Sequence, residues 1–190
     1  MQRVVRMRRV FRSFGWVPFV LLGAFAACSS ADDSSDQVRE ALQQDVVLQA
    51  SDFGCIKDWP QVRDFRITNK LGQEADSVAR ANAPGEGDYP VGTVIQVVPV
   101  EAMVKRAPGF SPESNDWEFF LLDVTESGTT ITSRGVADVV GPGGNCLDCH
   151  AQSERKWDLV CERDHGCGSI PVTPEFLLML QDTDPRCSAP

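Results

Sequence analysis

The chain has 190 residues, of which 42% are hydrophobic and 24% are charged, and its net charge is −9 at pH 7. This length predicts a single domain with one well-buried core and tails. An acidic chain without a basic stripe repels nucleic acid, so we expect no nucleic-acid partner.

The N-terminus has the pattern of an export signal. Arginines at five of the first twelve positions precede an apolar run over residues 14–27. This run is too short to cross a bilayer as a helix, and it contains Pro18. We therefore expect residues 1–27 to be a signal peptide and not a membrane anchor.

A cysteine follows the apolar run directly. Phe25-Ala26-Ala27-Cys28 resembles the lipobox of bacterial lipoproteins, in which small residues precede a cysteine that receives diacylglycerol. The resemblance implies that a lipid on Cys28 is the only membrane anchor and that the protein lies on the periplasmic side of the cell envelope. Because Ser29 and not an aspartate follows, the outer membrane is favoured. The alternative is ordinary cleavage after Ala27, which would release a soluble periplasmic or secreted protein.

Removal of the signal makes the chain more acidic. Five of the 18 basic side chains precede Cys28, so 13 remain against 27 acidic ones, a net charge of −14. Such a surface would attract a basic redox partner protein. The alternative is that the acidic charge only keeps the protein soluble.

Regular structure is expected to follow a polar tether. Residues 28–50 form the tether, in which Val38, Leu42 and Val46 have the spacing of a short amphipathic helix. Beyond it, residues 73–81 look helical. Four β-rich runs, separated by Gly, Pro and Asn-Asp clusters, are predicted as strands over residues 62–68, 93–100, 117–124 and 129–133.

The remaining elements complete the predicted fold. Thr173 and Pro174 have the pattern of an N-cap and first residue of a C-terminal helix. Residues 117–122 are apolar at nearly every position, which indicates a central strand covered on both faces. Residues 51–190 are therefore expected to be one mainly β domain of the α+β class, an antiparallel sheet with short helices.

One motif carries specific chemistry, Cys146-Leu147-Asp148-Cys149-His150. In c-type cytochromes two thiols at this spacing add across the haem vinyl groups, and the adjacent histidine is the proximal iron ligand. The export signal is consistent with this reading, since haem is attached outside the cytoplasm. We therefore predict one covalent haem c, with Cys146 and Cys149 as anchors and His150 as the iron ligand.

Three other readings of the motif are open. A thioredoxin-type redox pair would follow a strand of a βαβ unit. A structural zinc site would need a fourth ligand, for which Cys161, Cys167 and His165 are candidates. A plain disulfide between Cys146 and Cys149 is the third.

The other cysteines form an even set. With Cys28 lipidated and two thiols on haem, the residues that remain are Cys55, Cys161, Cys167 and Cys187. An oxidising compartment favours two disulfides among them, and three pairings exist. The pairing of Cys161 with Cys167 around a short loop, and of Cys55 with Cys187, is the one we favour.

With the β-rich body and the motif placed, the sequence resembles the cytochrome P-460 family, which includes the beta-type cytochromes c prime. The resemblance covers roughly residues 52–151, through the Tyr89-Pro90-Val91-Gly92-Thr93 element, the run that starts at Trp117, and Gly143 to His150. It implies an antiparallel β fold with a C-terminal haem motif. It also implies a five-coordinate iron in an aromatic pocket, for which Trp117, Phe119 and Phe120 are the candidate lining residues.

The resemblance also frames the alternatives for activity. P-460 enzymes that oxidise hydroxylamine carry a lysine bonded to the haem, but residues 71–104 contain no lysine. Lys70 and Lys105 flank this gap and are expected to be solvated surface charges. An enzymatic activity is therefore uncertain.

A sixth iron ligand would make an electron carrier. Met103, Met179 and His165 are the candidates, and Glu118 is a candidate proton acceptor if it points into the pocket. We expect first a five-coordinate haem that binds a small diatomic gas, NO or CO, or senses redox state. An electron-transfer cytochrome and a hydroxylamine- or NO-oxidising enzyme are the alternatives, and the oligomeric state is open, a dimer included.

Overall fold

The structure is a computed structural model that describes residues 44–83, 85, 87–168 and 172–187. The expected signal peptide, Cys28, and most of the tether with Val38 and Leu42 lie outside the described residues. Within the described part of the chain, no helix is long and apolar enough to span a membrane.

The predicted antiparallel sheet is confirmed as the body of the protein; it has six strands, which follow one another in chain order. The strands are β1 (Gln61–Val62), β2 (Phe65–Asn69), β3 (Thr93–Gln96), β4 (Glu101–Lys105), β5 (Trp117–Thr125) and β6 (Gly128–Gly135). A separate small hairpin consists of β7 (Val140–Gly141) and β8 (Gly144–Asn145). Every connection joins neighbouring strands, so the sheet is a simple meander.

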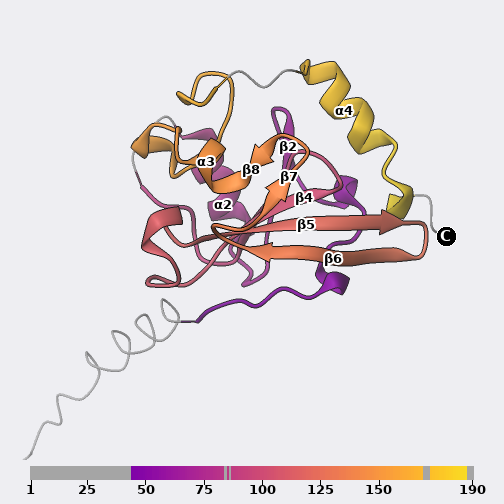
Figure 1. Cartoon of the computed structure of the whole chain (residues 1–190), viewed down its shortest axis with the longest axis horizontal. Coiled ribbons are helices and arrows are strands. Elements are labelled where there is room, and N and C mark those ends of the chain that lie inside the picture. The colour runs from indigo at the N-terminus through magenta and orange to yellow at the C-terminus, as the bar shows by residue number, and fades with distance from the viewer. Residues whose placement is uncertain (1–43, 84, 86, 169–171, 188–190) are drawn as a thin grey trace, which may run out of the picture.

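The two faces of the sheet cover two separate apolar clusters. The first contains Trp117 and Phe119 of β5 together with Phe65 and Val160, and Cys146 and Leu147 of the motif pack against it. The second contains Phe120 of the same strand with residues of the N-terminal segment, Leu48 and Phe53 among them. In Figure 1 the motif helix and the small hairpin lie on one side of β5 and β6, and the indigo N-terminal segment passes on the other.

The helices are short, as the sequence predicts. Among the described residues they are α2 (Glu74–Asn82), α3 (Cys146–His150) and α4 (Pro174–Asp182), with 3-10 turns at Ala50–Asp52, Ile56–Asp58, Pro112–Ser114, Arg155–Trp157 and Pro185–Cys187. At the start of α4, the Thr173 side chain accepts a hydrogen bond from the Phe176 backbone N–H, and Pro174 occupies the first turn. This cap confirms the predicted C-terminal helix.

Several predicted elements differ in detail from the observed ones. The run over residues 62–68 is a hairpin, because the chain turns at Arg63, whose φ is +51°. The run over residues 93–100 ends as a strand at Gln96, and the whole of β4 was not predicted. The chain around Val46 has no helix, since residues 44–49 are irregular and run beside the sheet, where Arg134 donates to the Leu48 carbonyl at 3.0 Å.

Two disulfides close the fold in the favoured pairing. Cys55 is bonded to Cys187 across 132 positions of sequence, and Cys161 to Cys167 across 6. The first disulfide joins the start of the domain to the 3-10 turn after α4. The second encloses the short loop that follows the motif helix.

Loss of the Cys55–Cys187 disulfide should destabilise the domain more than loss of Cys161–Cys167. The loop-closure entropy that a disulfide removes from the unfolded chain corresponds to about 5 kcal/mol for the larger loop and about 2 kcal/mol for the smaller. Urea unfolding of Cys55→Ser/Cys187→Ser and of Cys161→Ser/Cys167→Ser measures both losses. Equal losses in the two double variants would contradict this expectation.

Candidate functional site

The motif Cys146–His150 is the whole of helix α3, and it begins directly after the β7–β8 hairpin. Asn145 caps the helix, since its Oδ1 accepts from the Asp148 N–H at 3.0 Å while its Nδ2 donates to the Ala137 carbonyl at 2.6 Å. The Cys146 N–H also donates to the Val139 carbonyl at 3.0 Å. These bonds fix the start of α3 on the sheet side that carries Phe119.

Both motif cysteines are free thiols, and they lie three positions apart on one short helix. Cys149 is exposed, whereas Cys146 is half-buried against the first apolar cluster. Burial raises the pKa of the Cys146 thiol, and the carboxylate of Glu101 adds to the effect. Every other cysteine in the described part of the chain is in a disulfide.

His150 is held in one orientation by a backbone carbonyl. Its Nδ1 lies 2.7 Å from the Leu159 carbonyl oxygen, and because a carbonyl only accepts, Nδ1 must carry the proton. The other ring nitrogen, Nε2, then presents a lone pair. Burial lowers the pKa of His150, which favours the neutral imidazole that binds metals. Nε2 is therefore the ring nitrogen available as a ligand atom, on the same short helix as two free thiols.

Aromatic residues of β5 divide between the two faces of the sheet. The Phe119 ring packs against the His150 ring, with centroids 5.0 Å apart at 44°. Trp117 lies on the same face and donates from Nε1 to the Asp158 carbonyl at 2.8 Å. Phe120 lies on the opposite face, with its ring centroid 5.3 Å from that of Phe53. The expectation that all three line one pocket is therefore wrong for Phe120, because neighbouring residues of a strand point to opposite faces.

Glu118 is on the face opposite the motif as well. Its carboxylate is buried between Arg106 and Arg134, at 2.7 Å from the Arg134 Nε. It pairs with two guanidinium groups under the N-terminal segment, and it does not point toward His150. The proposed role of a pocket proton acceptor does not fit this position.

Three side chains were candidates for a sixth iron ligand. Met103 is buried on the motif side of the sheet, directly opposite Phe119 in the pairing of β4 with β5. Met179 is 46% exposed on α4. His165 stacks on Trp157 with ring centroids 3.8 Å apart, and its Nδ1 bonds the Val160 carbonyl at 2.6 Å. Met103 alone combines burial with a place beside Phe119.

Neither flanking lysine is the solvated surface charge expected from sequence. Lys70 Nζ donates to the Asp52 carbonyl at 2.7 Å and lies over the Trp59 ring. Lys105 is only 4% exposed, and its Nζ lies 2.8 Å from both carboxylate oxygens of Asp158. Both prediction failures have one cause, since each lysine is held by a partner distant in sequence.

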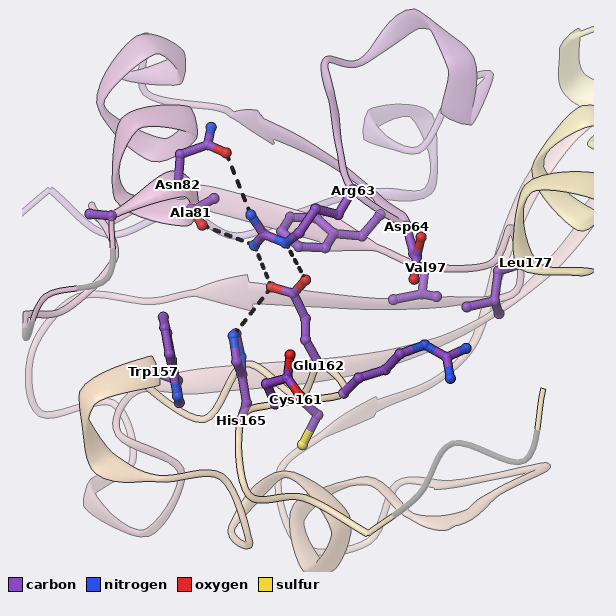
Figure 2. A pocket seen from close by; sticks show the side chains of 14 residues that line it. Arg63, Asp64, Ala81, Asn82, Val97, Trp157, Cys161, Glu162, His165 and Leu177 are labelled. Atoms are coloured by element: carbon purple, nitrogen blue, oxygen red, sulfur yellow. Dashed lines mark hydrogen bonds and ion pairs between the residues drawn. The ribbon is translucent and has the colours of Figure 1, made fainter. Parts of the chain in front are cut away.

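A cleft of about 340 Å³ opens beside the loop that follows α3 (Figure 2). Cys161 lines it, and the sulfur of this residue lies 3.6 Å from the Cys149 carbonyl, so the cleft begins next to the motif helix. Arg63 points between the end of α2 and Glu162, donating to the Ala81 carbonyl at 2.9 Å and pairing with the Glu162 carboxylate. The guanidinium and carboxylate neutralise each other, which leaves the cleft without an unpaired charge at this point.

Sequence reasoning missed three residues around the motif. Glu101 is a half-buried carboxyl whose pKa is raised by burial, and a Cβ at Gly141 would lie 2.7 Å from its Oε1. The Leu159 carbonyl accepts a hydrogen bond from His150. The carbonyl of the preceding residue, Asp158, accepts one from Trp117 and so fixes the backbone next to Leu159. No short motif marks these residues, because Leu159 acts through its backbone and Glu101 is brought to the motif by β4.

The alternative readings of the motif gain no support. Within residues 44–83, 85, 87–168 and 172–187, no group of three histidine, cysteine or acidic side chains is arranged to hold a metal ion. Cys161 and Cys167, the proposed zinc ligands, are bonded to each other. The motif follows an antiparallel hairpin and not a parallel βαβ unit, and its two thiols are not joined.

Comparison with family models, with curated proteins and with solved structures found no match. Any cofactor must therefore be inferred from the residues themselves. Two free thiols and a neutral imidazole with a bare Nε2 stand on five consecutive residues, beside the apolar ring of Phe119. This donor set fits the two thioether bonds and the single axial ligand that a c-type haem requires.

Proposed function

We propose that the protein is an exported c-type cytochrome with one covalent haem at Cys146, Cys149 and His150. The observation that carries the proposal is the hydrogen bond from His150 Nδ1 to the Leu159 carbonyl, 2.7 Å long. Metal-ligating histidines commonly donate their second ring N–H in this way, which fixes both the tautomer and the ring plane. Here the bond leaves Nε2 as the ring nitrogen with the lone pair, on the residue next to the free thiol of Cys149.

Each residue of the site has a separate task in this proposal. Cys146 and Cys149 anchor the porphyrin, His150 is the axial ligand, and Phe119 packs against the imidazole and limits access of water. When bound, the haem supplies an iron that changes oxidation state and takes a small ligand at a vacant coordination position.

Binding of NO or CO, or redox sensing, at a five-coordinate haem is the favoured activity. Two of the candidate sixth ligands are poorly suited, since His165 is engaged with Trp157 and Val160, and Met179 is exposed on α4. Both lysines that flank the Tyr89 element are held by other groups, which argues against a bond from lysine to the haem. The hydroxylamine-oxidising activity is accordingly the weakest of the three.

A six-coordinate electron carrier is the second candidate. It is favoured by Met103, a thioether buried beside Phe119 on the motif side of the sheet. Such a ligand would block the position that a gas molecule needs and would favour electron transfer to a partner protein. The acidic chain suits a basic partner in that case.

Covalent attachment is tested by extraction. In the wild-type protein we expect haem absorbance to stay with the chain after denaturation and acid-acetone treatment, because thioether bonds survive both. Cys149→Ser should lose most of this absorbance, while Cys55→Ser/Cys187→Ser, with cysteines removed far from the motif, should keep it. A wild-type chain whose haem is fully extracted would exclude the c-type assignment.

The coordination number is tested by absorption spectra of the reduced protein. We expect a broad high-spin spectrum that shifts on addition of NO or CO, with the same behaviour in Met103→Leu. A sharp low-spin α-band without added ligand, lost in Met103→Leu, would instead establish the electron carrier. A far-red Soret band with hydroxylamine turnover, abolished in Lys70→Gln or Lys105→Gln, would establish the enzyme.

Export and lipid anchoring are part of the same proposal and are supported by the sequence of residues 1–28. Metabolic labelling with radioactive palmitate should mark the wild type and leave Cys28→Ser unlabelled. If both chains are labelled equally, the lipid is not on Cys28, and if neither is labelled while both are processed, the signal ends in ordinary cleavage.

A further inference from the structure

The backbone that presents the Leu159 carbonyl to His150 has an unusual conformation. Asp158 has a φ of +52° and Leu159 a φ of +58°, so two successive residues are left-handed. Aspartate tolerates this region, but a leucine side chain clashes with the backbone there. Such a conformation persists only where the surrounding contacts impose it. The contacts around Asp158 therefore decide where the Leu159 carbonyl points.

The Asp158 carboxylate is bound by groups from three other parts of the chain. Lys105 Nζ lies 2.8 Å from each oxygen, the Asn115 side-chain amide donates at 2.6 Å, and the Tyr89 backbone N–H donates at 2.7 Å. Asp158 is 1% exposed. A carboxylate that is buried and bound by three separate donor groups has no freedom to move.

The backbone of the same residue is fixed as well. The Asp158 carbonyl accepts from Trp117 Nε1 at 2.8 Å, and Lys105 also lies over the Trp117 ring at 5.3 Å from its centroid. Trp117 is two residues from Phe119 on the same face of β5, and Phe119 packs on His150. The lysine, the aspartate and the histidine thus form one connected structure on a single face of the sheet.

We infer that Asp158, with Lys105 as its counter-ion, is a positioning residue that aims the Leu159 carbonyl at His150 Nδ1 and so keeps Nε2 in the ligand orientation. The inference rests on the proposed haem site, but its geometry is that of the chain alone. Groups that orient a metal-ligating histidine change the strength of the ligand without touching the metal. Lys105 therefore serves the haem through Asp158 and not through a bond to the porphyrin.

A second buried ion pair provides the matched control. Asp184 is also 1% exposed and pairs with Arg186 at 2.7 Å, close to the Cys55–Cys187 disulfide. Loss of either carboxylate leaves a buried cation unpaired, so both losses should lower thermal stability. Only the loss of Asp158 should change His150.

The first test reads the His150 tautomer by nitrogen-15 NMR of the full-length chain without haem. The chain has two histidines, so the signals of His165→Gln assign the remaining ring. We expect the wild type and Asp184→Asn to hold the Nδ1–H form. Asp158→Gly, which removes the carboxylate but tolerates a positive φ, should shift the ring toward the Nε2–H form, and Asp158→Asn should lie between. An unchanged tautomer in Asp158→Gly would overturn the inference.

The second test uses the haem-loaded protein and resonance Raman spectra of its reduced form. The iron–histidine stretching band should move to lower frequency and broaden in Asp158→Gly, partly recover in Asp158→Asn, and stay at the wild-type position in Asp184→Asn. An identical band in all four proteins would overturn the inference while the haem site stands. Absence of haem from the wild type would refute the proposed function alone, since the tautomer test does not require the cofactor. If Asp158→Gly does not fold, Asp158→Asn carries both tests.

Discussion

Burial of β5 on both faces is the constraint on which the rest of the structure depends. Successive residues of a strand point to opposite faces, so Trp117 and Phe119 belong to one cluster and Glu118 and Phe120 to the other. A register slip of one residue would exchange the two sets and bring the Glu118 carboxylate under the motif helix. The two arginines that bind Glu118 oppose such a slip, because they lie on the other face.

The parts of the fold that depend on local sequence signals could be predicted. The strands around β5 and β6, the helix α2 and the cap of α4 follow from residue patterns within a few positions of one another. β4 was missed because the segment from Glu101 to Lys105 lacks the run of β-branched residues that marks a strand. The predicted pocket position of Phe120 and the predicted solvent exposure of Lys105 were both wrong, since each depends on a partner far along the chain.

The candidate site shows the same division between local and distant determinants. The motif could be found from spacing alone, because the haem attachment proposed for it needs five consecutive residues. The group that orients His150 could not, since a backbone carbonyl leaves no mark in the sequence and Asp158 meets Lys105 across 53 positions. Pairing of buried cations has a further effect on the surface. Lys105, Arg106 and Arg186 are all buried beside carboxylates, so they do not offset the exposed acidic groups of the surface.

The Cys55–Cys187 bond also changes what a protease can do to this domain. Its two Cα atoms are 4.6 Å apart, and together with the backbone the bond makes residues 55–187 a closed covalent ring. A single cut at any peptide bond inside the ring opens it but leaves both fragments joined through the sulfurs. A nicked chain would therefore keep every strand, the motif helix and the Lys105–Asp158 pair in one molecule, so release of a fragment requires either a second cut or a reductant.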